Sequence, residues 1–195
     1  MPVVTLAEID ATARKAARGH GCPWGLAEEA GKSTRWLASH GLPGVEALAD
    51  MLRERAQCCT VSGPPCALRL CAAMADRVGM SGEEPVGGDM AGHPLLVLAQ
   101  MGRTADALDR SFALEWEEGS ATVSRHAVSI GGTFAASSMV CSPTADTGGE
   151  CIPLPGSRPV EERAWVALRD LSHRTLVPAS AASRTGAGAG TSDND

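Results

Sequence analysis

The sequence predicts an α+β domain: an N-terminal helical unit, a central antiparallel meander, and a C-terminal helix followed by an extended tail. Apolar residues recur every three or four positions over most of the first 78 residues and again near the C-terminus, which is typical of amphipathic helices. Between about residues 112 and 141, apolar and polar residues alternate around glycine-containing turns, which is typical of antiparallel strands.

The first two helices are predicted from their ends. Thr5 and Glu8 form a capping-box pattern, so a helix begins there and stops at Gly19. Pro23 suits the first position of a second helix because its missing N–H costs nothing there. This second helix is expected to end near His40.

A third helix is predicted to begin at Gly44, and the helical spacing of apolar residues becomes less clear after it. The apolar run Cys66–Val78 predicts a fourth helix, and the Gly-, Pro- and acid-rich stretch Gly79–His93 predicts a loop. The buried run Leu95–Gln100 fits either a short strand or a helix segment.

Three strands are predicted in the meander. Phe112–Trp116 alternates as a half-buried strand, Glu117–Ser120 is read as a hairpin loop, and Ala121–Ile130 as the next strand. Gly131-Gly132 then predicts a two-residue hairpin turn into Thr133–Cys141.

These turns predict which side chains share a face, because strand side chains alternate. Trp116 is expected opposite Ala121, Leu114 opposite Val123, His126 opposite Ser137 and Thr122 opposite Cys141. The apolar face carries Phe112, Leu114, Trp116, Val123, Ala127, Phe134, Ala136 and Val140. The polar face carries Glu115, Thr122, Ser124, His126, Ser137 and Cys141, mixed with Val128, Ile130 and Met139. Arg125 fits the apolar face only at an edge.

The remaining chain is a long loop, Pro143–Pro159, and an amphipathic helix over about 159–172, with Val160, Ala164, Leu168 and Leu171 along its apolar side. We expect a single domain over residues 1–178, with a helical part at about 5–78 and a sheet part at about 94–141. Residues 179–195 form a Gly/Ala-rich tail.

Composition narrows the possible partners. The chain has 195 residues, 3% aromatics and a net charge of -6, which disfavours nucleic acid and anionic membranes. A small molecule or a protein is the expected partner, and a homodimer that completes the aromatic-poor core is compatible with this composition. Seven cysteines in a chain without a recognisable secretory signal predict reduced thiols and a cytoplasmic setting.

The segment His20–Gly31 is the first candidate site, with His20, Trp24, Glu28 and Glu29 as binding residues. Cys22 is placed near a helix N-terminus, which favours a thiolate, although a small buried side chain is the more common role. Trp24 is expected to anchor the core between the first two helices, or else to wall a pocket. The two glutamates also suit a solvated helix start.

The polar face of the meander is the second candidate site. Here His126 is the candidate base, and Ser137 or Cys141 the candidate nucleophile, because opposed strand residues lie about 5 Å apart. The alternative is an ordinary solvated sheet face.

No metal or cofactor is expected. Cys58, Cys59, Cys66 and Cys71 lack the paired CxxC spacing of zinc sites, and no HExxH or phosphate-binding glycine loop occurs.

Two segments together, GCPWGLAEEAG with the following RWL and the C-terminal string VPASAASRTGAGAGTSDND, resemble a bacterial family known only as a domain of unknown function. The resemblance spans the chain and implies a fold in one piece, a cytoplasmic setting and no established reaction. It also implies that an apolar residue is usual at the place of Cys22. As a family hallmark, the tail is expected to dock, with Asp193 and Asp195 meeting arginines or a helix N-terminus.

Two functions follow as expectations. The first is an accessory protein that binds a small metabolite or a partner through the His20–Glu29 turn and the tail. The second is a small cofactor-free enzyme acting on a polar metabolite through His126 with Ser137 or Cys141.

Overall fold

The computed structural model describes residues 1–54, 65–81, 84–89, 92–125, 127–134, 136–146 and 156–176. It confirms the predicted α+β architecture, with N-terminal helices, a five-stranded antiparallel sheet and a C-terminal helix. In chain order the elements are β1 (Val3–Thr5), α1 (Leu6–Gly19), α2 (Trp24–Ser39), α3 (Gly44–Glu54), α4 (Ala67–Ser81), β2 (Val86–Asp89), α5 (Pro94–Leu108), β3 (Ser111–Trp116), β4 (Gly119–Val123), β5 (Val128–Gly132), β6 (Ser138–Thr144), β7 (Ser157–Pro159) and α6 (Glu162–His173).

The predicted helix ends are largely confirmed. The Thr5 hydroxyl accepts a hydrogen bond from the Glu8 backbone N–H at 3.2 Å, and the Glu8 carboxylate accepts one from the Thr5 N–H at 3.0 Å. This reciprocal pair satisfies two N–H groups that the first turn leaves without partners. Helix α1 ends at Gly19, as predicted. Pro23 is the N-cap of α2, so this helix begins at Trp24, one residue later than expected.

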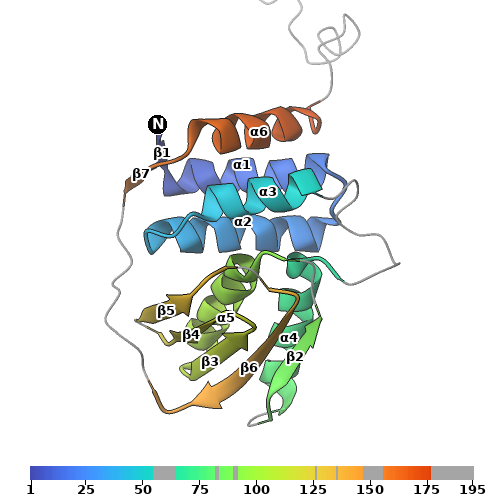
Figure 1. Cartoon of the computed structure of the whole chain (residues 1–195). Coiled ribbons are helices and arrows are strands. Elements are labelled where there is room, and N and C mark those ends of the chain that lie inside the picture. The colour runs from blue at the N-terminus through green and yellow to red at the C-terminus, as the bar shows by residue number, and fades with distance from the viewer. Residues whose placement is uncertain are drawn as a thin grey trace, which may run out of the picture.

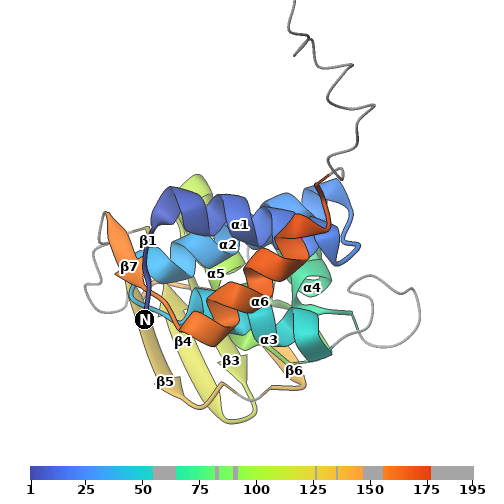
Figure 2. The same ribbon diagram turned by 90° about the horizontal axis from the view of Figure 1, so that it is seen from above.

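The helices form a layer above the sheet. Helix α1 packs along α2 and α6, and α3 packs against α2 and α6. Figure 1 shows α6 at the top, α1, α3 and α2 beneath it, and α4, α5 and the sheet below. From above, α6 lies across this layer between α1 and α3 and ends beside the C-terminal end of α1 (Figure 2).

Helix α5 links the helical layer to the sheet. Of the two alternatives for Leu95–Gln100, the helix is the one observed. Every residue of α5 from Pro94 to Gly102 is buried, because α2 and α4 cover one side and β3 and β4 the other. A helix that is apolar around its circumference belongs in such a position.

The sheet order is β2-β6-β3-β4-β5, so the expected loop at Gly79–His93 is wrong in part. Its residues Val86–Asp89 form edge strand β2, antiparallel to β6. The sequence VGGD has little strand propensity, and pairing with β6 supplies the missing stability. Gly87 permits this pairing, because a Cβ there would lie 2.5 Å from the Met139 carbonyl oxygen.

The Gly131-Gly132 hairpin prediction is also wrong. The chain reverses between Val123 and Val128, which pair with each other, so β4 and β5 form the hairpin and Gly119 faces Gly132. Gly132 has a φ of +87° and lies against the Glu118 carbonyl, so this glycine allows close backbone approach at the strand end.

The β3–β4 turn is tighter than predicted, which changes the pairing register of the two strands but not the faces of β3. Trp116 pairs with Gly119 and Leu114 with Ala121, a shift of two residues from the predicted partners. Because strand side chains alternate with a period of two, this shift leaves the predicted faces of β3 unchanged. Phe112, Leu114 and Trp116 are buried as expected.

The faces of β6, unlike those of β3, differ from the prediction, because β6 pairs with β2 and β3 instead of β5. Met139 and Cys141, expected on the polar face, are buried. Val140 and Phe134, expected to meet the core, are 45% and 42% exposed. The turn prediction placed β6 beside the wrong strand and in the wrong register, which reversed its faces.

The C-terminal part combines a confirmed helix with a shorter loop. Helix α6 begins at Glu162, later than the predicted start at about residue 159, and Glu161 caps its N-terminus. It buries Ala164 and Leu168 as expected, and Val160 is buried just before it. The expected loop Pro143–Pro159 is interrupted by the end of β6 at Thr144 and by β7, which pairs with β1. The tail 179–195 lies outside the described residues.

Candidate functional site

His20 lies where α1 meets α6. It is the C-cap of α1, with its N–H donating to the Ala16 carbonyl at 2.9 Å. A Cβ at Gly19 would overlap the Leu171 carbonyl oxygen, so only glycine lets the two helix ends approach this closely. Gly19 thus both ends α1 and places His20 beside α6.

The neighbouring residues Cys22 and Trp24 lie in different environments. Cys22 is fully buried, so its expected buried position is confirmed. Trp24 is 64% exposed, and the Arg18 guanidinium lies 5.0 Å from the centre of its ring. The expectation that Trp24 anchors the core is therefore wrong, because the turn at Gly21, with a φ of +100°, directs α2 so that its first residue faces solvent.

The two glutamates face different surroundings. Glu28 is exposed and lies 3.9 Å from Lys32. Glu29 accepts a 2.7 Å hydrogen bond from the Arg103 guanidinium on α5 and a 3.2 Å one from Lys32. Burial by itself raises the pKa of Glu29, but the hydrogen bonds and charges of Arg103 and Lys32 together outweigh burial and lower the pKa. Glu29 thus ties α2 to α5 as a carboxylate.

The polar face on which the predicted register placed Ser137 and Cys141 is not formed, because Cys141 pairs with Leu114 instead of Thr122 and is buried. The Ser137 hydroxyl donates to the Glu117 carboxylate on the exposed β3–β4 turn. Cys141 lies on the inner face of the sheet, where burial raises the pKa of its thiol to about 12. His126 lies outside the described residues, so its catalytic role stays a prediction.

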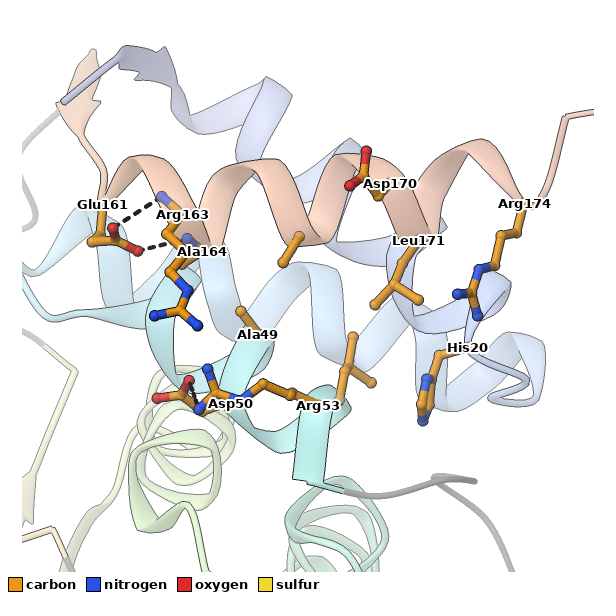
Figure 3. Close-up of a pocket in the computed structure, with 12 residues that line it drawn as sticks. His20, Ala49, Asp50, Arg53, Glu161, Arg163, Ala164, Asp170, Leu171 and Arg174 are labelled. Carbon is orange, nitrogen blue, oxygen red and sulfur yellow. Dashed lines mark hydrogen bonds and ion pairs between the residues drawn. The ribbon is translucent and has the colours of Figure 1, made fainter.

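Of the predicted binding residues, His20 lines a sizeable groove formed by described residues. This groove lies between α3 and α6, is about 440 Å³ in volume and is closed at one end by the C-terminal end of α1 (Figure 3). Such a volume is typical of small-ligand sites. Its lining residues are His20, Ala49, Asp50, Leu52, Arg53, Glu161, Arg163, Ala164, Ala167, Asp170, Leu171 and Arg174.

The two ends of the groove are charged and its middle is apolar. Arg163 and the Asp50–Arg53 pair lie at one end, and Arg174 and His20 at the other (Figure 3). Between them lie Ala49 and Leu171 (Figure 3), and Leu52 and Ala167 also line the groove.

The acidic residues of the groove have other roles. Asp50 binds Arg53 at 2.8 Å. Glu161 accepts the N–H groups of Arg163 and Ala164 at 2.9 and 2.6 Å, and these bonds lower its pKa. The Asp170 carboxylate points away from α3 (Figure 3).

Arg163 and Arg174 are the remaining cations of the groove, and the charge of Arg163 also contributes to the lowered pKa of Glu161. Neither makes an ion pair with any residue that the structure describes. The His20 Nε2 atom is buried and has no hydrogen-bond partner among the same residues. A buried polar atom without a partner costs about 1–3 kcal/mol, so a ligand that bonds to it gains affinity.

Sequence reasoning missed the arginines of α6, although a signal was present. Arg163 and Ala167 are four residues apart on the predicted helix, and Arg174, seven residues further on, continues the same face just past its predicted end. Nothing local indicates that this face meets α3.

The fold and the groove define the class: an α+β protein whose helical layer carries a surface groove with charged ends. Within the described ranges, no helix is long and apolar enough to cross a membrane, and no three His, Cys, Asp or Glu side chains are placed to hold a metal ion.

Residues 4–81 match the model of a family described as "Protein of unknown function (DUF3726)". This confirms the predicted resemblance to an uncharacterised family over β1–α4, including the motif Gly21–Gly31, and the C-terminal string lies outside the match. The matched segment supplies the α1 and α3 walls of the groove, whereas α6 lies beyond it. No curated protein and no solved structure matches the chain.

Proposed function

We propose that this protein is an accessory binding protein that holds an anionic ligand in the α3–α6 groove. The observation that carries the proposal is the pair Arg163 and Arg174, which bracket an apolar floor without ion-pair partners among the described residues. A guanidinium presents a planar fork of donors that matches carboxylates and phosphates.

The spacing of the two arginines defines the ligand further. Eleven residues separate them (174 minus 163), which corresponds to about 16 Å along a helix axis. A small carboxylate or phosphate reaches one end of the groove, beside Arg174 and His20. A ligand that binds both arginines must be extended, with an anionic group at each end and an apolar stretch between them.

Binding has more support than catalysis on the sheet. The Cys141 thiol is protonated and buried at neutral pH, so it is a poor nucleophile. The Ser137 hydroxyl is engaged by Glu117, and the pairing that was expected to place His126 beside it is replaced by the β4–β5 hairpin. We place the binding protein in the cytoplasm, where cysteines such as Cys22 and Cys71 stay reduced.

The test is a thermal-shift titration with inorganic phosphate, citrate and straight-chain dicarboxylates of increasing length. A ligand at a hundredfold excess over its Kd stabilises the fold by about 2.7 kcal/mol, so Tm rises. We expect Arg174→Gln to remove this rise for every ligand that binds, and Arg163→Gln to remove it only for the longer dicarboxylates that reach both arginines.

The matched control is Arg169→Gln, since Arg169 lies on the same helix but lines a different groove. It should retain the full ligand-induced rise in Tm. The proposal is wrong if no anion in the panel raises Tm, or if all three substitutions reduce the rise equally, which indicates nonspecific screening.

A further inference from the structure

A second groove lies on the other side of α6, against α1. Its volume is about 370 Å³, and its lining residues are Glu8, Ala11, Thr12, Lys15, Trp165, Arg169, Ser172, His173 and Leu176. This groove shares no residue with the α3–α6 groove. We propose that it is the docking surface for the C-terminal segment of the same chain, residues 177–195.

The charge of the groove favours an acidic occupant. Lys15 and Arg169 form no ion pair with residues in the described part of the chain. Glu8, the one carboxylate of the lining, is already bonded to Thr5 in the capping box. Two cations without ion pairs favour an acidic occupant of this groove, although the net charge of the whole protein is -6.

The position of the chain favours its own C-terminal segment as that occupant. Leu176, the last described residue, is 58% exposed and already lines the groove, so the C-terminal segment is covalently attached at the groove. The segment carries Asp193 and Asp195 as its acids, and between Pro178 and Thr191 it has only small side chains apart from Arg184. A chain of small residues can lie close against two helices.

The length of the segment is sufficient. Arg169 is in α6, and Leu176 follows the end of that helix seven residues later. Seven residues correspond to about 10 Å along a helix axis. The 17 residues from 177 to 193 span up to about 56 Å when extended, so Asp193 can return to Arg169 and Lys15. A tether of this kind gives an effective concentration in the millimolar range, so even weak ion pairs hold the segment in place.

The test uses Arg184, a trypsin site inside the segment, in the native full-length chain. Cleavage of a segment that docks and releases tracks the released fraction, so a segment docked nine-tenths of the time is cut about tenfold more slowly. Intact-mass spectrometry measures the product cut after Arg184. We expect slow cleavage in the wild type and about tenfold faster cleavage in Lys15→Gln/Arg169→Gln and in Asp193→Asn/Asp195→Asn.

The matched control is Arg163→Gln/Arg174→Gln, which alters the α3–α6 groove and should leave the cleavage rate unchanged. Raising the salt concentration should speed cleavage of the wild type toward the rate of the charge variants, which tests the proposal even if a variant fails to fold. A synthetic peptide of residues 177–195 reports the effect of salt on trypsin itself.

The proposal is overturned if the wild type is cut as fast as both charge variants. It is also overturned if protection increases with protein concentration, because the segment then docks on another copy. Neither outcome affects the thermal-shift test, since the two proposals use different arginines.

Discussion

At the scale of single residues, the most informative contact outside the grooves is the Glu29–Arg103 ion pair. Arg103 also donates to the Gln100 side chain at 2.8 Å, and Glu29 raises the pKa of the buried Cys71 thiol, whose value of about 12 has burial as its main cause. These groups lie where α2, α4 and α5 meet, so they join the family-matched helices to the rest of the chain.

Glu29→Gln should lower the free energy of unfolding at pH 7 by about 1–2 kcal/mol, because it weakens a partly buried charge-assisted hydrogen bond. The pKa of Glu29 is lowered by folding, so its contribution is complete above about pH 4.5 and is lost as the pH falls through the folded pKa. Urea unfolding at pH 7 and at pH 3–4 measures both effects, and the difference between variant and wild type should shrink at the lower pH.

Glu28→Gln is the matched control, since Glu28 is exposed and its pairing with Lys32 at 3.9 Å is weak. We expect a change within about 0.5 kcal/mol. Equal losses from the two substitutions at pH 7 would contradict the assigned role of Glu29.

A second prediction concerns the thiols. Burial raises the pKa of Cys71 and of Cys141 to about 12, so neither forms much thiolate at pH 8. In native protein at pH 8, we expect iodoacetamide to leave both unmodified in peptide mass mapping. The same treatment in urea should label them fully, and rapid native labelling of Cys141 would revive it as a candidate nucleophile.

At the scale of elements, helix packing depends on small residues at crossings. Trp36 of α2 is 8% exposed, stacks on His40 with ring centres 3.9 Å apart, and lies against Gly102 of α5. The indole ring occupies the space of a missing side chain, so Gly102 sets the distance between the helical layer and α5.

Gly102→Ala should therefore destabilise the protein by about 1–3 kcal/mol, because the new methyl group overlaps the Trp36 ring. Gly79→Ala is the control: Gly79 lies in α4 with open space around it, so alanine should stabilise by about 0.4–1 kcal/mol. Equilibrium urea unfolding followed by Trp fluorescence compares the two. If Gly102→Ala leaves the free energy of unfolding unchanged, α2 and α5 can shift to accommodate the methyl group, and the predicted role of Gly102 is wrong.

At the scale of the whole molecule, buried residues of the helical layer, α5 and the sheet form one continuous hydrophobic cluster. The family match ends at residue 81, yet α2 and α4 bury side chains against α5, and α1 packs against α6. The matched segment is thus covered by elements outside it.

A fragment of residues 1–81 should consequently fail to fold by itself. We expect no cooperative urea transition by far-UV circular dichroism, whereas the full chain should unfold in one transition with coincident fluorescence and dichroism curves. This comparison also tests the single-domain expectation for residues 1–178. A cooperative transition in the fragment, or two separate transitions in the full chain, would contradict it.

The sequence by itself determined the helices whose signals are local. The capping box at Thr5 and Glu8, the stop at Gly19 and the start at Gly44 are all found as predicted. These signals work because helix hydrogen bonds and side-chain spacing involve residues at most four positions apart. The inward face of β3 was equally predictable, because a two-residue register error preserves alternation.

Only the tertiary structure decided the order of strands and the contents of the site. Strand β2 exists because β6 pairs with it, and that same pairing buries Cys141. Of the predicted binding residues, His20 alone lines the α3–α6 groove, beside Arg53 of α3 and two arginines in and directly after α6. Strand partners and groove walls come from segments far apart in sequence, so they are set by packing energies that no local pattern encodes.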